Sequence, residues 1–300
     1  MPLKNIFTTI QVSQRKKKVI KTILLKEQEN LNVTNIHSID KKNIGDYFCA
    51  PHHYFDELKN TQEDIFNFKS ECKKTRKGFI DKVSRNAIIV GGGGLLNRGG
   101  FKRQMKLMED LTHKNKKVIL WGIGHNEKDP SSFGKVKNYN VDLQKFGLAG
   151  TRDFTMPGDY VPCVSCLHPI FDNTYEVIQE VGVVFHKETL FVPEILAKFK
   201  DYPSTSNTTD LISLIRFIGS SEKIITDSYH AMYWSMLLGK AVVVVPNSSK
   251  FYDFKYKPIF SSFEESLNDL KKSNEYSGVL EECRSINTEF SEKVFNYLDL

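Results

Sequence analysis

Short apolar runs alternate with helical stretches along most of this chain. Seven runs rich in β-branched residues predict strands over 33–39, 86–90, 117–121, 146–151, 181–185, 222–226 and 241–245. Apolar positions at helical spacing predict helices over 101–113, 208–219, 231–238 and 278–300, and a further helix through Phe55 and Leu58. The predicted strands are almost continuously apolar, which is typical of parallel sheets covered on both faces. The pattern therefore predicts an α/β protein.

One segment interrupts this rhythm. Residues 156–162 read Met-Pro-Gly-Asp-Tyr-Val-Pro and concentrate turn formers between two periodic regions. The chain has 300 residues, about twice the common domain size of roughly 150. We therefore expect two α/β domains, over 1–158 and 159–284, followed by a C-terminal helix over 285–300. Near its start, the helix over 208–219 is expected to be capped by Thr208 or Thr209.

Composition and charge narrow the class of protein. The hydrophobic fraction of 40% excludes a disordered chain, and the net charge is +6. Residues 1–30 hold seven Lys or Arg and two Glu, a charge of +5, so the other 270 residues together carry only +1. A nucleic-acid binder would carry a basic face on its folded body, and we expect none here. The run of Arg15, Lys16, Lys17 and Lys18 is either a solvated helix face or a contact with anionic lipid, at about 1 kcal/mol per basic residue.

Cysteine usage and hydropathy indicate a compartment. Five cysteines form no disulfide framework, which favours a reducing cytoplasm. The first 30 residues show no signal-peptide pattern, and the longest strongly apolar run, 241–245, is far shorter than a membrane span. We expect a soluble cytoplasmic protein, with membrane association through the basic run as an option. Cys163 and Cys166 lack a second cysteine pair, so a structural role is favoured over zinc or redox chemistry, and no metal site is predicted.

Candidate chemistry lies where strands end, because ligands of open parallel sheets gather at the carboxyl ends of the strands. The strongest backbone signal is a tetraglycine after the strand over 86–90, formed by Gly91, Gly92, Gly93 and Gly94. Residues without Cβ let the backbone approach an anion near a helix start, or they form a tight packing turn. The order of the glycines matches neither a dinucleotide fingerprint nor a P-loop, so ordinary NAD or ATP binding is not expected.

Two further turns carry groups that could transfer protons. His230 stands in the first turn of the helix after Thr226, with Asp227 or Ser228 as its cap, and could hold an anion or exchange a proton. It could equally bond only a neighbouring backbone group. Asp46, after Asn43 and Gly45, is either a general acid or base or a helix cap.

Cations and histidines follow other strands. Arg152 could bind an anionic substrate through two parallel hydrogen bonds, or it could pair with Asp153 on the surface. His125 follows a Gly-Ile-Gly turn, and His186 and Lys187 follow the strand over 181–185. His125, His186 and Lys187 are each well placed for a ligand, but none of them is by itself a strong signal of function.

Taken in order, these turns resemble the polysaccharide pyruvyl transferase family. The matching pieces are Asn-x-Gly-Asp at 43–46, the strand and glycines at 88–95, Gly-Ile-Gly at 122–124, Gly-Thr-Arg-Asp at 150–153, Thr-Asp-Ser-Tyr-His-Ala at 226–231 and Gly-Lys-Ala at 239–241. The resemblance implies a GT-B-like fold of two Rossmann-like domains with parallel sheets facing a cleft and a C-terminal helix that returns to the N-terminal domain. It also implies transfer of the enolpyruvyl carbons of phosphoenolpyruvate to two sugar hydroxyls as a cyclic ketal.

The resemblance assigns roles to the candidate residues. His230 would be the general acid or phosphate contact, Asp46 the base, and Arg152 with Lys187 the anion clamp. The donor side would also include Asp227, Ser228, Tyr229 and His186, and the acceptor side Asn43, Gly45, the four glycines and His125. Phosphoenolpyruvate would be a co-substrate, with no tightly bound cofactor, and the acceptor a glycan or lipid-linked saccharide.

The chain departs from the family at one position. Several members carry Arg-Leu-His where this chain has Ser228-Tyr229-His230. Without that arginine, the anion would need Arg98, Arg103, Arg152 or Lys187. Two alternatives therefore stay open: a GT-B-type glycosyltransferase that uses a nucleotide sugar, and an inactive glycan-binding protein.

Overall fold

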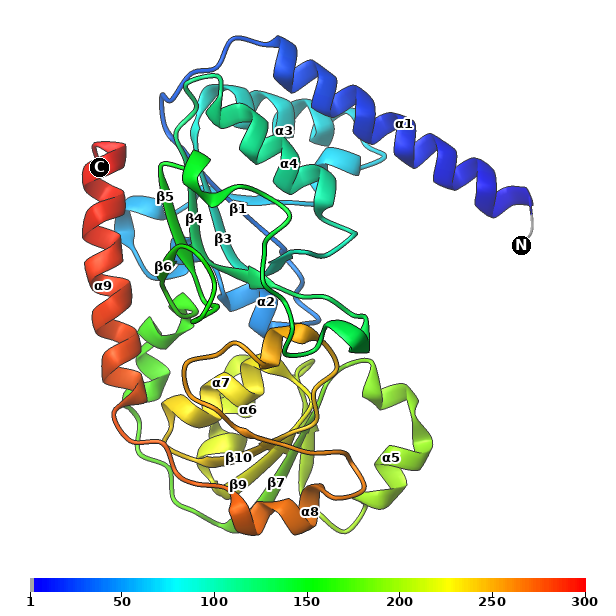
Figure 1. Cartoon of the computed structure of the whole chain (residues 1–300), viewed down its shortest axis with the longest axis vertical. Coiled ribbons are helices and arrows are strands. Elements are labelled where there is room, and N and C mark those ends of the chain that lie inside the picture. Colours follow the sequence, from blue (N-terminus) through cyan, green and yellow to red (C-terminus); the bar gives the residue numbers. More distant parts are fainter. Residues whose placement is uncertain (1–2) are drawn as a thin grey trace.

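The computed structural model describes residues 3–300, with side chains from residue 11 onward, and contains two separate parallel sheets (Figure 1). The first is 6-stranded, in the order β2-β1-β3-β4-β5-β6. Its strands are β1 (Val33–His37), β2 (Gln62–Asp64), β3 (Ala87–Leu96), β4 (Val118–His125), β5 (Leu148–Thr151) and β6 (Asp159–Tyr160). The second is 5-stranded, in the order β11-β10-β9-β7-β8. Its strands are β7 (Gln179–Phe185), β8 (Ser204–Ser206), β9 (Ser221–Thr226), β10 (Ala241–Val244) and β11 (Ile259–Phe260).

Helices cover both faces of the first sheet, which explains its continuous apolar strands. On one face α1 (Leu3–Leu25), α3 (Lys73–Arg85) and α4 (Lys102–Thr112) enclose a core that includes Ile88 and Val90 of β3. Ile89, between them, points to the opposite face and packs with the C-terminal helix α9 (Val279–Leu298). Alternate residues of one strand therefore serve two cores.

The second sheet is covered in the same way. The helices α6 (Leu211–Gly219) and α7 (Tyr229–Leu237) pack on Val184, Ile224 and Val242. The segments around α5 (Pro193–Lys198) and α8 (Ser266–Asp269) close the other face. Asp210, one residue beyond the predicted caps, is the N-cap of α6, and its carboxylate accepts from the Ser213 amide at 2.9 Å.

The C-terminal helix ties the two domains together. In Figure 1, α9 runs up one side of the molecule from the second domain to the first. Its residues Phe290, Val294 and Leu298 are buried in the core of the first domain beside Trp121. Asn287 accepts a hydrogen bond from Trp121 Nε1 at 3.0 Å. The expected return of this helix is confirmed, and the helix begins at Val279, one residue after the start predicted from its apolar pattern, so the division expected at residue 285 falls inside it. The two Rossmann-like domains of a GT-B-like fold are thus present.

The predicted boundary after residue 158 is wrong. Asp159 and Tyr160 form β6, which pairs with β5, so these residues still belong to the first sheet. The connection to the second sheet comes later, through short 3₁₀ helices over 164–167 and 169–172, before β7 begins at Gln179. Turn-forming residues flank this short edge strand, so the composition of the segment indicated a linker and gave no sign of a strand.

The predicted helix through Phe55 and Leu58 is also wrong in its extent. The helix α2 covers only Ile44–Phe48, and Pro51 then begins a separate 3₁₀ turn. Proline cannot donate the hydrogen bond that a continuing helix requires.

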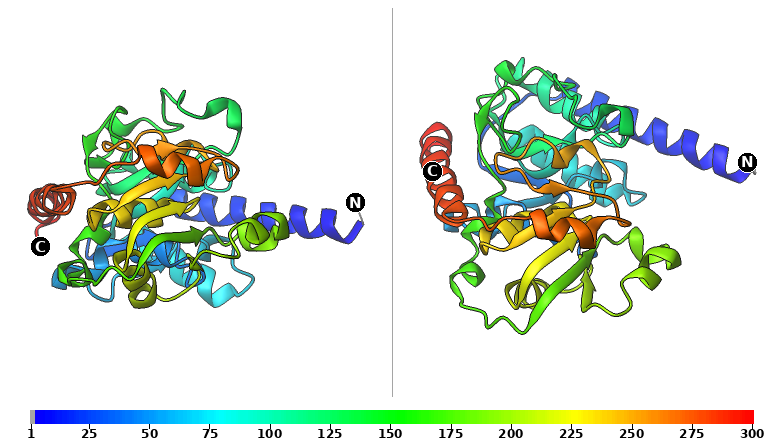
Figure 2. Two further views of the ribbon diagram at one scale, coloured as in Figure 1. Left: turned by 90° about the horizontal axis from the view of Figure 1, so that it is seen from below. Right: turned by 60° about the horizontal axis from the view of Figure 1, so that its bottom comes forward.

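The basic helix α1 extends beyond the body of the protein (Figure 2). Its second half packs through Val19 and Ile23 into the first core. Arg15 pairs with Glu71 at 3.2 Å, and Lys16 lies 5.6 Å from the centre of the Phe68 ring. Two of the four clustered basic residues therefore contact the domain itself. None of the helices described, α1 included, combines the length and the apolarity needed to cross a bilayer.

Candidate functional site

A polar pocket of about 210 Å³ lies between the domains. The first domain contributes the segments after β1, β3, β4 and β5, and the second contributes those after β7, β9 and β10. Eleven of the predicted residues line it: Asn43, Asp46, Gly92, Gly93, Gly94, Arg152, His186, Lys187, Ser228, Tyr229 and His230. The prediction that the candidate residues gather at the carboxyl ends of the strands is therefore confirmed, although several of these residues have other contacts than expected.

Asp46 is a carboxylate of the pocket and not a helix cap. It lies inside α2, and its Oδ2 accepts from Asn43 Nδ2 at 2.9 Å. Asn43 in turn accepts from Asn207 of the second domain at 3.1 Å, so the carboxylate is oriented by a contact across the cleft. Burial raises the pKa of Asp46, while Lys250 and Arg152 oppose that shift. This environment suits a group that accepts a proton during a reaction.

Gly45 and His230 form a close contact between the domains. A Cβ added to Gly45 would lie 2.1 Å from His230 Nδ1, so only glycine admits the imidazole against α2. His230 Nε2 is 3.6 Å from Cys163 Sγ, and the residue is buried. Burial lowers the pKa of His230 well below its ordinary value, and Arg152 and Lys250 act in the same direction. His230 is therefore neutral near pH 7 and can donate a hydrogen bond without supplying positive charge.

The tetraglycine is part of a strand and does not open a helix. The strand β3 runs through all four glycines to Leu96, and α4 begins only at Lys102. Gly92 has a φ of +65°, and a Cβ there would lie 1.9 Å from the Cys49 carbonyl oxygen. Gly91 faces Asn35 and Pro51 and does not line the pocket. The glycines thus let β3 pass under α2, and the expectation that they stand at a helix start is wrong, although Gly92, Gly93 and Gly94 line the pocket.

Arg152 is buried in the pocket and does not pair with its neighbour. Its guanidinium lies 4.0 Å from the centre of the Tyr229 ring, and its Nε has no hydrogen-bond partner among the described side chains and backbone. Asp153 instead accepts from the His125 amide at 2.7 Å and from the Tyr139 hydroxyl at 2.9 Å. The alternative of a surface Arg152–Asp153 pair is wrong, and a buried guanidinium is left for a ligand.

Lys187 and Asp227 are engaged in the protein itself. Lys187 Nζ pairs with Asp40 Oδ2 of the first domain at 2.7 Å, so it helps to close the cleft. Asp227 accepts from the His186 amide at 2.6 Å and from the Thr189 hydroxyl, and it does not line the pocket. Its carboxylate organises the loop that carries His186. Burial lowers the pKa of His186 to about 4, so this side chain is neutral.

His125 and Ser228 also differ from expectation. His125 lies outside the pocket, and its Nδ1 contacts Ser249 Oγ of the second domain at 2.7 Å. His125 was expected on the acceptor side of the cleft, and this contact instead links the first domain to the second. Ser228 is the N-cap residue of α7 and lines the pocket, but its side chain makes no capping hydrogen bond.

Sequence reasoning missed Lys250. It lies in the short turn after β10, lines the pocket and is half-buried. Burial lowers its pKa to about 7, and the nearby Lys128 and Arg152 contribute to this shift. The signal that could have found it is its place after the strand over 241–245, although Pro246 there indicated only a stop. Arg98 also lines the pocket, whereas Arg103 contacts Ser13 on α1 and lies elsewhere.

Comparisons with known proteins give a distant structural similarity. No family model matches the chain. No curated protein matches it either. A solved structure assigned as a UDP-N-acetylglucosamine 2-epimerase from Listeria monocytogenes aligns with a TM-score of 0.43 at 12% identity, over 82% of this chain and 89% of that one. The residues of the pocket are therefore the basis for a functional assignment.

Proposed function

We propose that the interdomain pocket binds phosphoenolpyruvate and transfers its enolpyruvyl carbons to two hydroxyls of a sugar as a cyclic ketal. This is the activity of the polysaccharide pyruvyl transferases, which the strand-end motifs resemble. The observation that carries the proposal is the buried Arg152, whose Nε lacks a partner in a pocket that also holds Lys250 and Asp46.

The charge of the pocket suits a compact polyanion. Five cations line it against three carboxylates. Lys187 is paired with Asp40 at 2.7 Å, and Lys128 lies 4.0 Å from Glu188. The cations left are Arg98, Arg152 and Lys250, none of which forms an ion pair in the part of the chain that the structure describes. They would bind the phosphate and carboxylate in place of the arginine that Ser228 replaces.

Lys250 is the proposed general acid. An ammonium whose pKa is about 7 can donate a proton at neutral pH, whereas His230 is held neutral by burial. Lys250 would protonate the methylene carbon of phosphoenolpyruvate, leaving a cationic centre at the neighbouring carbon. His230 would then donate a hydrogen bond to the bound anion. This assignment differs from the general-acid role that the family resemblance gave to His230.

Asp46 is the proposed base. It would take the proton of the first sugar hydroxyl as that oxygen bonds to the cationic carbon. The second hydroxyl then bonds to the same carbon, the carbon–oxygen bond to phosphate breaks, and the second proton leaves with the phosphate. Phosphoenolpyruvate and a diol thus give a ketal and inorganic phosphate, with no oxidant or reductant required.

The experiment is a thermal-shift screen of the full chain. Phosphoenolpyruvate is compared with UDP, GDP and CDP, because a ligand at 100 times its dissociation constant stabilises by about 2.7 kcal/mol. We expect stabilisation by phosphoenolpyruvate, its loss in Arg152→Met and its retention in Arg103→Met, a matched arginine outside the pocket. Stabilisation by a nucleoside diphosphate alone would instead favour a nucleotide-sugar glycosyltransferase. No stabilisation by any of these compounds would favour the inactive glycan-binding protein.

A further inference from the structure

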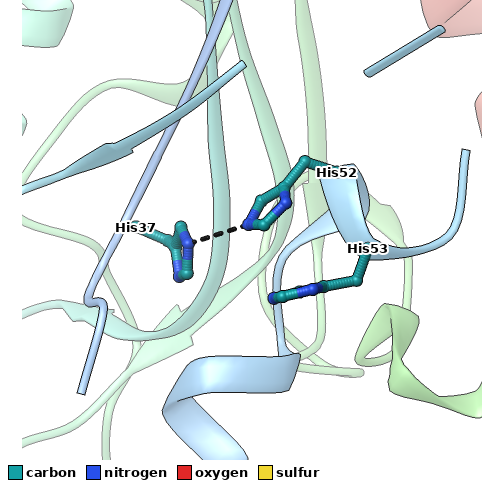
Figure 3. A group of neighbouring side chains, drawn as sticks. All are labelled: His37, His52 and His53. Atoms are coloured by element: carbon teal, nitrogen blue, oxygen red, sulfur yellow. Dashed lines mark hydrogen bonds between the residues drawn. The ribbon is translucent and has the colours of Figure 1, made fainter. Parts of the chain in front are cut away.

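Three histidines gather in the first domain, outside the interdomain pocket (Figure 3). His37 is the last residue of β1, and His52 with His53 belongs to the 3₁₀ turn that follows α2. One ring nitrogen from each lies within 4.8 Å of the others. Residues from separate parts of the chain thus bring three imidazoles together, a juxtaposition that their sequence spacing did not reveal.

The closest pair already has the separation of metal ligands. Nε2 of His37 lies 3.1 Å from Nε2 of His52, and Figure 3 shows the two rings facing one another through these atoms. Two nitrogens bound tetrahedrally to one zinc ion at 2.0–2.1 Å would lie about 3.3 Å apart. A small movement of either ring would therefore place an ion between them.

The third histidine has its tautomer defined by the backbone. Nε2 of His53 lies 2.9 Å from the Tyr47 carbonyl oxygen, which can only accept, so Nε2 carries the hydrogen of the neutral ring. The lone pair is then on Nδ1. A hydrogen bond from the second ring nitrogen to a carbonyl is the usual support of a metal-binding histidine.

Hydrogen bonding within the protein does not account for the cluster. Only one hydrogen can lie between the two Nε2 atoms, so His37 and His52 share a single hydrogen bond. Nδ1 of the fully buried His37 has no hydrogen-bond partner in the part of the chain that the structure describes. No partner therefore fixes the tautomer of His37, so its ring can carry the hydrogen on Nδ1 and present the lone pair of Nε2 to an ion.

We propose that His37, His52 and His53 form a binding site for a divalent transition-metal ion of the zinc type. Three imidazole nitrogens favour zinc, cobalt, nickel or copper over magnesium and calcium, which prefer oxygen ligands. The fourth position would be taken by water, because His52 and His53 are only half-buried. The ion would join β1 to the turn after α2, the helix that carries Asp46. The proposal is independent of the reaction assigned to the interdomain pocket.

The test uses the full chain without a polyhistidine tag. Titration with Co²⁺ should give the visible absorption of a four- or five-coordinate ion, at one ion per chain, and Zn²⁺ should displace it. His52→Ala and His53→Ala should each weaken binding at least tenfold. His113→Ala, at an exposed position on the surface, should bind as the wild type does. Mg²⁺ should neither bind nor displace Co²⁺.

Two results would overturn the proposal. One is the absence of stoichiometric Co²⁺ or Zn²⁺ binding by the wild type, and the other is unchanged binding in both single variants. A measurement on the wild type alone covers the case in which a variant fails to fold. Zn²⁺ should protect His52 and His53 from modification by diethylpyrocarbonate and leave His113 reactive, and equal modification with and without Zn²⁺ would refute the site.

Discussion

Replacing Lys250 by methionine should stabilise the folded protein at neutral pH and abolish its binding of phosphoenolpyruvate. Burial among other cations lowers the pKa of Lys250 from 10.5 to about 7. The unfolded chain therefore binds one more proton than the folded chain between pH 7 and 10.5. The charged Lys250 destabilises the folded state most below pH 7, where the lysine is protonated in both the folded and the unfolded chain. This destabilisation decreases as the pH rises from 7 and disappears near pH 10.5.

The size of the effect follows from the two pKa values. Each pKa unit corresponds to 1.36 kcal/mol, so holding the charged Lys250 costs on the order of 4–5 kcal/mol at pH 6.5 and about 1.4 kcal/mol at pH 9.5. For 300 residues, an unfolding entropy of roughly 2.1 cal/mol/K per residue gives about 1.6 °C for each kcal/mol. The contacts of the lysine stem that are lost do not depend on pH, so Lys250→Met should raise Tm by roughly 3–7 °C at pH 6.5, a change about 5 °C more favourable than the one at pH 9.5.

The assay is thermal unfolding of both proteins at the two pH values, with and without phosphoenolpyruvate. Lys135→Met, at an exposed position, serves as the control and should change Tm by less than about 1 °C. The ligand should stabilise the wild type and not Lys250→Met. A Tm gain that is the same at both pH values, or a lower Tm at pH 6.5, would refute the reasoning from buried charge.

Two further substitutions test contacts that hold the pocket together. Gly45→Ala should lower stability by about 1–3 kcal/mol and weaken binding of phosphoenolpyruvate, because the Cβ of the new alanine would lie 2.1 Å from His230 Nδ1. The control is Gly99→Ala, where an added Cβ meets nothing within 4 Å, and it should be nearly neutral in the same thermal-shift assay. Equal effects of the two substitutions would contradict the contact between Gly45 and His230. Asn287→Ala should leave the buried Trp121 Nε1 unpaired and lower the free energy of unfolding by about 1–3 kcal/mol. Chemical denaturation measures this loss, and an unchanged denaturation midpoint would rule it out.

The strands of the fold were predictable because their physical cause is local. A strand buried on both faces is apolar along its length, and β3, β4 and β10 show this pattern, as do the C-terminal parts of β7 and β9. The edge strand β2 reads Gln-Glu-Asp and gives no such signal. Its pairing with β1 depends on the surrounding structure, which no local pattern records.

The candidate site was predictable only in part, for the same reason. Asp46, Arg152 and His230 follow strands, and the carboxyl ends of the strands meet at the cleft. What each residue does depends on its neighbours. The charge of Lys250 and the metal-like spacing of His37 and His52 arise from packing between distant segments.

Calorimetric titration of the full chain with phosphoenolpyruvate at pH 7 is the most direct test of the central claim, that the interdomain pocket binds this anion through Arg152 and Lys250. We expect one site per chain, competition by inorganic phosphate, and at least tenfold weaker binding in both Arg152→Met and Lys250→Met. Absence of saturable binding, or binding that neither substitution weakens, would contradict it.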